Sequence, residues 1–183
     1  IQGAAHEPFD AVMSRDVFEP LGMTRTTADG AHVEGVAAGY FPRAAENPAL
    51  GLQDAPAADY SCFAGAGQYV SNAGDLARFG GAMSAPGFLA LDTWSQWLEP
   101  VRTEAGVSTG VAFGWKVSEA SWHGTRTRVL TQRGTPMGAT AVLLVLPEPR
   151  LAIAITSNVS YATGVDPLAT AVAEAFGDGP PAR

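Results

Sequence analysis

The sequence is poor in the residues from which many active sites are built. It has one cysteine, Cys62, one lysine, Lys116, and three histidines that lie far apart, His6, His32 and His123. A single cysteine excludes an intrachain disulfide and a thiolate metal cluster, and there is no H-E-x-x-H pair. We therefore expect no metal and no other cofactor, although three distant ligands could still converge in the fold.

Long apolar runs and basic clusters are also missing. The longest strongly apolar run, 141–146, is far shorter than the ~20 residues that span a bilayer. The 11 basic residues are scattered among 18 acidic ones, for a formal net charge of −7. They form no stripe that would bind nucleic acid or an anionic membrane surface. We expect no membrane span and no nucleic-acid partner, and both a periplasmic or secreted and a cytoplasmic location remain open.

What is present is typical of a globular protein. Hydrophobic residues make up 46% of the 183 residues, which suits one domain or most of one. The chain starts at Ile1 rather than Met, which indicates a processed or truncated polypeptide.

The first part, 1–110, is expected to consist mostly of helices and loops. Apolar spacing predicts a helix over 8–17, which the Glu-Pro-Leu-Gly sequence of 19–22 breaks. Residues 27–68 are mostly irregular, with a short strand expected over 35–40. A loop-rich stretch of this length is uncommon unless it packs around a site.

Two further helices are expected in this part. Asn72 is predicted to cap the first, with Asp75 in a capping-box-like pattern, and the segment ends at Pro86. Asp92 is predicted to cap a short second helix that ends at Pro100.

The second part, 111–183, changes to a strand pattern. Strands are predicted over 111–117, 127–131, 139–146 and 151–156. The last two are apolar nearly throughout and flank a Pro-Glu-Pro-Arg connection, which predicts an antiparallel hairpin buried on both faces.

A closing helix is expected to cover this sheet. Asp166 is predicted as its cap and Gly177 as its end. Its core-facing residues are expected to be Leu168, Val172, Ala175 and Phe176.

No residue stands out as a nucleophile. There is no G-x-S-x-G, and no serine is followed three residues later by a lysine. A Ser-His-Asp triad remains open, because its members need not be neighbours. His123, between Trp122 and Gly124, favours a hairpin turn over a catalytic base.

A glycine-containing edge over 131–138 separates two predicted strands. Gly134 allows a ligand to approach the backbone closely, and Gly138 relieves crowding at the next strand. Exposed N–H groups there could stabilise negative charge on a carbonyl oxygen. The alternative is an ordinary glycine-containing hairpin loop.

Four segments, taken in order, resemble the serine β-lactamase-related proteins: class C β-lactamases, D-alanyl-D-alanine carboxypeptidases and family VIII-type esterases. VFEPLGMTRT (17–26) resembles the family's FxPLGMxxT turn, and AGAGQYVSNAGDLARF (64–79) resembles AGGGLxSTAxDLxRF. GTPMG (134–138) is similar to the H-x-G-x-x-x-G lead into a strand, and 142–158 to the closing hairpin that ends in TN.

The resemblance implies an α/β (α+β) fold, in which an antiparallel sheet is flanked by helices. Residues 1–183 would be the C-terminal part of one such domain, incomplete in this chain. It also implies serine attack on an ester, amide or β-lactam carbonyl through an acyl-enzyme. The family's S-x-x-K nucleophile motif and its Tyr-x-Asn motif would then lie upstream of Ile1.

The family has a further motif of three residues: Lys or His, then Ser, Thr or Gly, then Gly. In this chain it aligns with Gln132, Arg133 and Gly134. Gln132 departs from this pattern because it carries no charge. Arg133 restores a cation one place along, where it could hold a substrate carboxylate or lie on the outer face. The resemblance implies that the backbone N–H of Thr135 is half of the oxyanion hole, and that Tyr69 borders the site or belongs to a turn.

Three hypotheses follow. In the first, the chain is part of a bacterial serine hydrolase, with an esterase or an uncharacterised hydrolase favoured. Its partners are then a small ester, amide or β-lactam substrate and the N-terminal segment of the same polypeptide. Alternatively it belongs to a non-catalytic binding protein on the same fold, as the neutral Gln132 would allow. The third is a globular module with a fortuitous resemblance. An uncovered sheet edge would also favour a homodimer.

Overall fold

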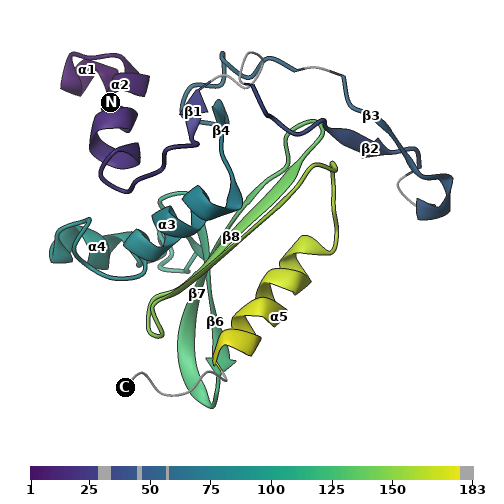
Figure 1. Cartoon of the computed structure of the whole chain (residues 1–183). Helices are drawn as coiled ribbons and strands as arrows, with labels where there is room; N and C mark the ends of the chain where they lie inside the picture. Colours follow the sequence, from purple (N-terminus) through teal and green to yellow (C-terminus); the bar gives the residue numbers. More distant parts are fainter. Residues whose placement is uncertain (29–33, 45–46, 57, 178–183) are drawn as a thin grey trace.

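The computed structural model describes residues 1–28, 34–44, 47–56 and 58–177. Its centre is a five-stranded antiparallel sheet in which strands follow one another in sequence order (Figure 1). The strands are β5 (Val111–Ala112), β6 (Trp115–Trp122), β7 (Thr125–Gly134), β8 (Thr140–Leu146) and β9 (Leu151–Ser157). The strands β8 and β9 pair antiparallel, from Thr140 opposite Ser157 to Leu146 opposite Leu151. This pairing confirms the predicted hairpin, since antiparallel neighbours need only a short turn.

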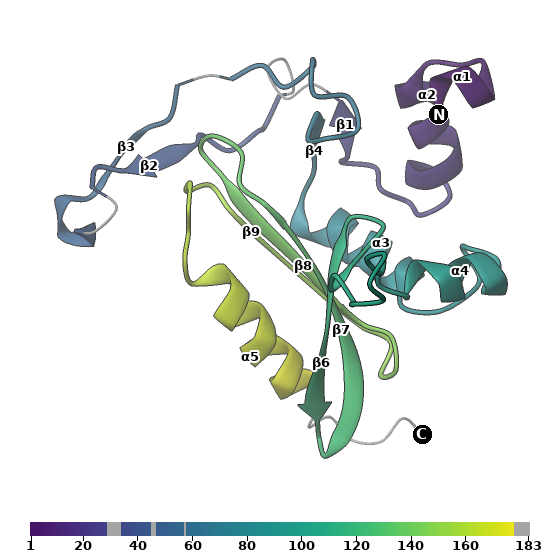
Figure 2. The ribbon, with the colours of Figure 1, turned by 180° about the vertical axis from the view of Figure 1, so that it is seen from behind.

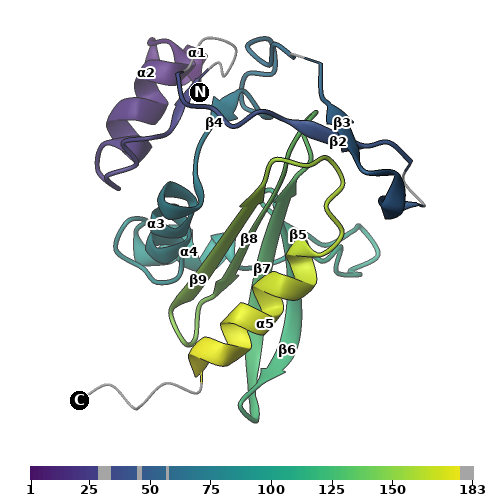
Figure 3. The same ribbon diagram turned by 45° about the vertical axis from the view of Figure 1, so that its right-hand side comes forward.

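The strand β8 is buried on both faces, as its apolar sequence predicted. The same prediction is wrong for β9, where only Ile153 is buried, because β9 pairs with a described strand on one side only. Leu143 and Val145 point to one face, where they pack in a cluster with α3 (Ala73–Met83) and α4 (Leu91–Trp97). Val142, Leu144 and Leu146 point to the other face, against α5 (Val165–Gly177). Because side chains alternate along a strand, one apolar run supplies both cores. Figures 2 and 3 show these helices on opposite sides of the sheet.

The predicted strand over 111–117 is two strands. Phe113 and Gly114 both have positive φ, 44° and 87°, and they form the turn between β5 and β6. Conversely, the strand predicted over 127–131 is the middle of the longer β7. Polar residues at both ends of β7 hid its length, because the pattern marked only its buried centre.

Of the four core-facing residues predicted for the closing helix, only Val172 packs in the cluster against the sheet. Val165, Ala169 and Ala173 are buried at four-residue intervals, whereas Leu168 and Phe176 are 51% and 67% exposed, and Ala175 is also exposed. Alanines allow α5 to lie close to the sheet, so the larger apolar residues are turned outward.

The predicted helix caps were right for one helix and wrong for two. Asn72 caps α3, since its Oδ1 accepts the N–H of Asp75 at 2.9 Å. The helix α4 begins after Ala90, so Asp92 lies within its first turn. In the same way α5 begins at Val165, and Asp166 is inside the helix.

The helix predicted over 8–17 is present as an uninterrupted helical run over 9–18. It consists of α2 (Phe9–Met13), which continues as a π-helical turn, η1 (Ser14–Phe18), and a short α1 (Gln2–Ala5) that was not predicted precedes it. Pro8 is the cap of α2 rather than its first residue.

Two separate pairs of short strands follow these helices along the chain, before α3. The strand β1 (Thr27–Ala28) pairs with β4 (Tyr69–Val70). The strand β2 (Tyr40–Pro42) pairs with β3 (Leu52–Asp54), with a 3-10 turn, η3 (Pro48–Leu50), between them. The strand expected over 35–40 therefore begins only at its last residue. The β2–β3 hairpin lies beyond the end of the sheet at which β7 meets β8 (Figure 3).

No helix of the described residues is long and apolar enough to cross a membrane. Within the same residues, no group of three or more metal-ligating side chains lies together.

Candidate functional site

One edge of β7 is open where the candidate site residues lie. Residues 132–134 pair with β8 on one side, with Gln132 opposite Leu143 and Gly134 opposite Ala141. On the other side, the pairing with β6 ends at Thr131. No described strand continues along that edge, so an extended ligand could pair with its backbone. Thr135 follows immediately and is exposed.

The two polar residues of this edge point to opposite faces of the sheet. Gln132 lies opposite Leu143 and therefore faces the α3 side, and it is exposed. Arg133 lies opposite Val142 and therefore faces α5. Arg133 therefore lies on the side of the sheet away from α3.

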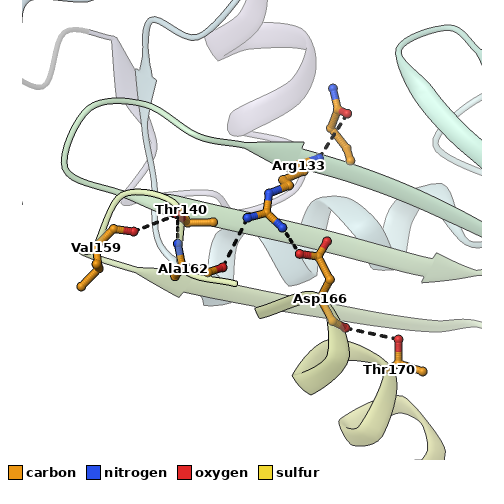
Figure 4. A network of polar contacts seen from close by, with 7 residues as sticks. Arg133, Thr140, Val159, Ala162, Asp166 and Thr170 are labelled. Carbon is orange, nitrogen blue, oxygen red and sulfur yellow. Dashed lines mark hydrogen bonds and ion pairs between the residues drawn. The ribbon is translucent and has the colours of Figure 1, made fainter. Parts of the chain in front are cut away.

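The Arg133 guanidinium is already paired on that face. Its Nη1 forms an ion pair with the Asp166 carboxylate, and its Nη2 donates to the Ala162 carbonyl at 3.3 Å (Figure 4). Both side chains are a little more than one-third exposed. A contact between Arg133 and a substrate stays a prediction, and it would require this ion pair to open.

The turn between β7 and β8 is held by segments far away in the sequence. The Met137 N–H donates to the Tyr60 phenol oxygen at 2.6 Å, and the Gly138 N–H donates to Ser160 Oγ at 2.7 Å. Sequence reasoning named neither Tyr60 nor Ser160. The only available signal was the length of the irregular 27–68 stretch, which indicated packing around a site.

A close backbone contact fixes the end of the same turn. Gly138 has φ of 81°, and a Cβ there would lie 2.9 Å from both the Gly39 Cα and the Ala55 Cβ. Only glycine combines this dihedral with this contact. The prediction that Gly138 relieves crowding is therefore confirmed, with Gly39 as the crowding partner.

Tyr69 lies in another part of the fold. Its hydroxyl donates to Asp10 Oδ1 at 2.8 Å, and its ring packs edge-on against Phe18 at 4.9 Å between centroids. Burial, followed by the hydrogen bond to Asp10, raises the pKa of Tyr69 above its usual value. None of its contacts among the described residues reaches 132–135. Tyr69 joins the N-terminal helices to β4, and its contact with a substrate stays a prediction.

A buried carboxylate joins the two most distinctive sequence segments, 17–26 and 64–79. Asp75 is 1% exposed. Its side chain accepts hydrogen bonds from the Arg25 N–H at 2.8 Å and the Thr26 hydroxyl at 2.9 Å, and it pairs with Arg78 at 2.8 Å. Asp75 thus does not close a reciprocal capping box but fixes the Pro-Leu-Gly-Met turn to α3.

His123 lies far from this site. It has φ of 44° and forms the two-residue β6–β7 turn with Gly124, which confirms the hairpin interpretation. Seven residues of β7, 125–131, separate it from Gln132, or roughly 25 Å at the usual rise of a strand.

These features define a β-lactamase/transpeptidase-like domain: an antiparallel sheet between helices, with an open strand edge that leads into a glycine-containing turn. A family model described as Beta-lactamase matches residues 1–176. The chain belongs to this family.

Solved structures have the same fold. A D-stereospecific amidohydrolase from Streptomyces sp. superposes with a TM-score of 0.71 at 19% identity, covering 97% of this chain and 51% of its own. The D-amino acid amidase from Ochrobactrum anthropi SV3, complexed with D-phenylalanine, gives 0.71 at 22%, covering 97% and 55%. EstCE1, a hydrolase with promiscuous acyltransferase activity, gives 0.59 at 18%, covering 94% and 52%.

The chain spans about half the length of these three structures. A search of curated protein sequences found no match.

Proposed function

We propose that this chain forms one wall of the active site of a serine acyl hydrolase. A serine on an upstream segment of the same polypeptide attacks an ester, amide or β-lactam carbonyl. The observation that carries the proposal is the open edge of 132–134, which runs directly into the exposed Thr135. In support, the family match covers residues 1–176, and its solved neighbours include an amidohydrolase and an amidase.

The chemistry assigned to this wall is electrostatic. As the serine oxygen bonds to the carbonyl carbon, the carbonyl oxygen becomes an anion. The Thr135 N–H and the N–H of the nucleophile donate to it. The C–O or C–N bond then breaks, the proton lost by the serine hydroxyl is passed to the leaving group, and the acyl-enzyme remains for water to hydrolyse. This role needs only the backbone at Thr135, so it does not depend on the residue at 132.

Gln132 and Arg133 favour a substrate with no carboxylate beside the scissile bond. Gln132 is neutral, and the Arg133 guanidinium is held by Asp166 on the other face of the sheet. Neither offers a free cation to a carboxylate. We therefore place esters and uncharged amides ahead of penicillins and of peptides with a free C-terminus. Gln132 and Gly134 are assigned contacts with the uncharged part of the substrate.

The N-terminal segment is proposed as the partner of the uncovered parts of this fold. The strand β9 pairs with β8 on one side only among the described residues. On α5, which packs against β9, Leu168 and Phe176 are exposed. Open edges and apolar faces of this kind associate. Residues 1–183 expressed alone should therefore dimerise or aggregate, and sedimentation as a stable monomer would contradict this.

The proposed reaction is tested with a nucleophile-directed aryl phosphonate. The full-length polypeptide should gain the mass of one phosphonyl group, with the label on an S-x-x-K serine, and should hydrolyse aryl esters. Residues 1–183 alone should stay unlabelled. A label on a serine within 1–183 would contradict the proposed location of the nucleophile.

A second candidate is a non-catalytic binding protein on the same fold. Gln132, in the place of the family's cation, is the observation that favours it. A full-length sequence without S-x-x-K, and without phosphonate labelling, would select this candidate.

A further inference from the structure

The turn that presents Thr135 lies between two fixed points. On its N-terminal side, Gly134 is paired with Ala141 in the β7–β8 ladder. On its C-terminal side, the Met137 N–H is bound by the Tyr60 hydroxyl at 2.6 Å. Between them, Thr135 and Pro136 are exposed, and Met137 is 46% exposed.

The other anchors of the turn act further from Thr135. The Gly138 N–H is bound by the buried Ser160, and Gly138 packs on Gly39. Both contacts fix the entry into β8. Among the described contacts of this turn, the one with Tyr60 is the side-chain contact nearest to Thr135.

Tyr60 is itself held in place. Its ring packs against Phe63 with 5.7 Å between centroids, its carbonyl accepts the Phe63 N–H at 2.9 Å, and its side chain is half-buried. It reaches the turn across 77 positions of the sequence. The Tyr60 oxygen is therefore held at a fixed position beside the Met137 N–H, because only two bonds of a tyrosine side chain rotate to move its ring.

We propose that Tyr60 is a positioning residue for the oxyanion hole: by binding the Met137 N–H, it sets the orientation of the Thr135 peptide. This inference rests on the proposed function. Oxyanion donors act only within a narrow range of distance and direction. A displacement of ~1 Å can cost up to 10²-fold in rate, so a partly displaced donor should cost about 10-fold.

The test compares two tyrosines in the full-length polypeptide. Tyr60→Phe removes only the oxygen that binds Met137. Tyr161→Phe is the control, because Tyr161 is 66% exposed in the loop after β9 and loses the same atom. With an aryl ester, Tyr60→Phe should lower kcat about 10-fold and leave KM within about two-fold. Tyr161→Phe should leave both constants unchanged.

A thionoester of the same alcohol separates positioning from a general structural role. Sulfur is larger than oxygen and accepts hydrogen bonds weakly, so a well-set oxyanion hole discriminates against it. Tyr60→Phe should reduce the oxo/thiono ratio of kcat/KM by about the same 10-fold. A variant that is only less well folded would lose activity on both substrates equally. Amide hydrogen exchange of Met137 should rise in Tyr60→Phe and not in Tyr161→Phe.

Two outcomes overturn the inference in distinguishable ways. An active wild-type enzyme whose Tyr60→Phe variant keeps its kcat and its oxo/thiono ratio would overturn the role of Tyr60 alone. A wild-type protein that neither reacts with phosphonate nor hydrolyses esters would overturn the proposed function and this inference together.

Discussion

The two ends of β7 are built in different ways. At its beginning, two residues with positive φ, His123 and Gly124, turn the chain back from β6. At its other end, the 135–138 turn is held by Gly39, Tyr60 and Ser160. The first turn is local and distant from the candidate site, whereas the second is assembled from three remote segments and carries Thr135. The end that carries the candidate site is thus the one whose geometry depends on the rest of the fold.

A matched pair of glycines tests this contrast most strongly. Gly124 and Gly138 have nearly equal φ, 80° and 81°, but a Cβ at Gly124 would meet nothing within 4 Å. Gly124→Ala should lower the free energy of unfolding by about 1–2 kcal/mol, the cost of a left-handed alanine. Gly138→Ala adds a clash with Gly39 and Ala55 and should cost more than about 3 kcal/mol. Urea unfolding of the full-length protein measures both, and equal losses would contradict the contrast.

The second prediction concerns the buried carboxylate that joins 17–26 to α3. Asp75→Asn removes the charge that Arg78, Thr26 and the Arg25 N–H share. It should lower the free energy of unfolding by about 2–3 kcal/mol, since charge-assisted hydrogen bonds are lost from a buried site.

Asp92→Asn is the control for this change, because Asp92 is exposed in the first turn of α4. It should cost less than about 0.5 kcal/mol. If urea unfolding showed that Asp75→Asn also costs less than about 0.5 kcal/mol, other contacts would hold the 17–26 turn to α3.

The smallest predicted effect is that of the ion pair on the outer face. Arg133→Gln should lower the free energy of unfolding by less than about 1 kcal/mol and leave the KM for an uncharged ester within about two-fold, because the pair with Asp166 is partly exposed. Arg126→Gln, which removes the exposed pair with Glu119 near the other end of β7, is the matched control. A tenfold rise in KM for Arg133→Gln alone would mean that Arg133 contacts substrate.

Local patterns predicted the local elements of this fold. The apolar runs over 139–146 and 151–156 predicted the central hairpin, and Asn72 predicted the start of α3, because each depends on neighbours in the sequence. The stripe of α5 was assigned wrongly in part, since the sequence favoured Leu168 and Phe176 over the small Ala169 and Ala173. Only the close approach of the helix to the sheet decides between them.

The site was predictable only in part, for the same reason. The 132–135 segment was found by its glycine and by its resemblance to a family motif. The direction of Arg133 depends on the register with β8, and the contacts of Tyr60 and Ser160 join residues 77 and 22 positions apart. No periodicity in the sequence marks such contacts.

The most direct test of the central claim is a footprint of the acylated site. The full-length protein is treated with an aryl phosphonate, and amide hydrogen exchange is compared before and after the reaction. We predict that residues 132–135 become protected, with the largest change at the Thr135 N–H, and that residues 121–126 at the other end of β7 do not change. Labelling without protection of 132–135 would contradict the assignment of this edge as the wall that binds the carbonyl oxygen.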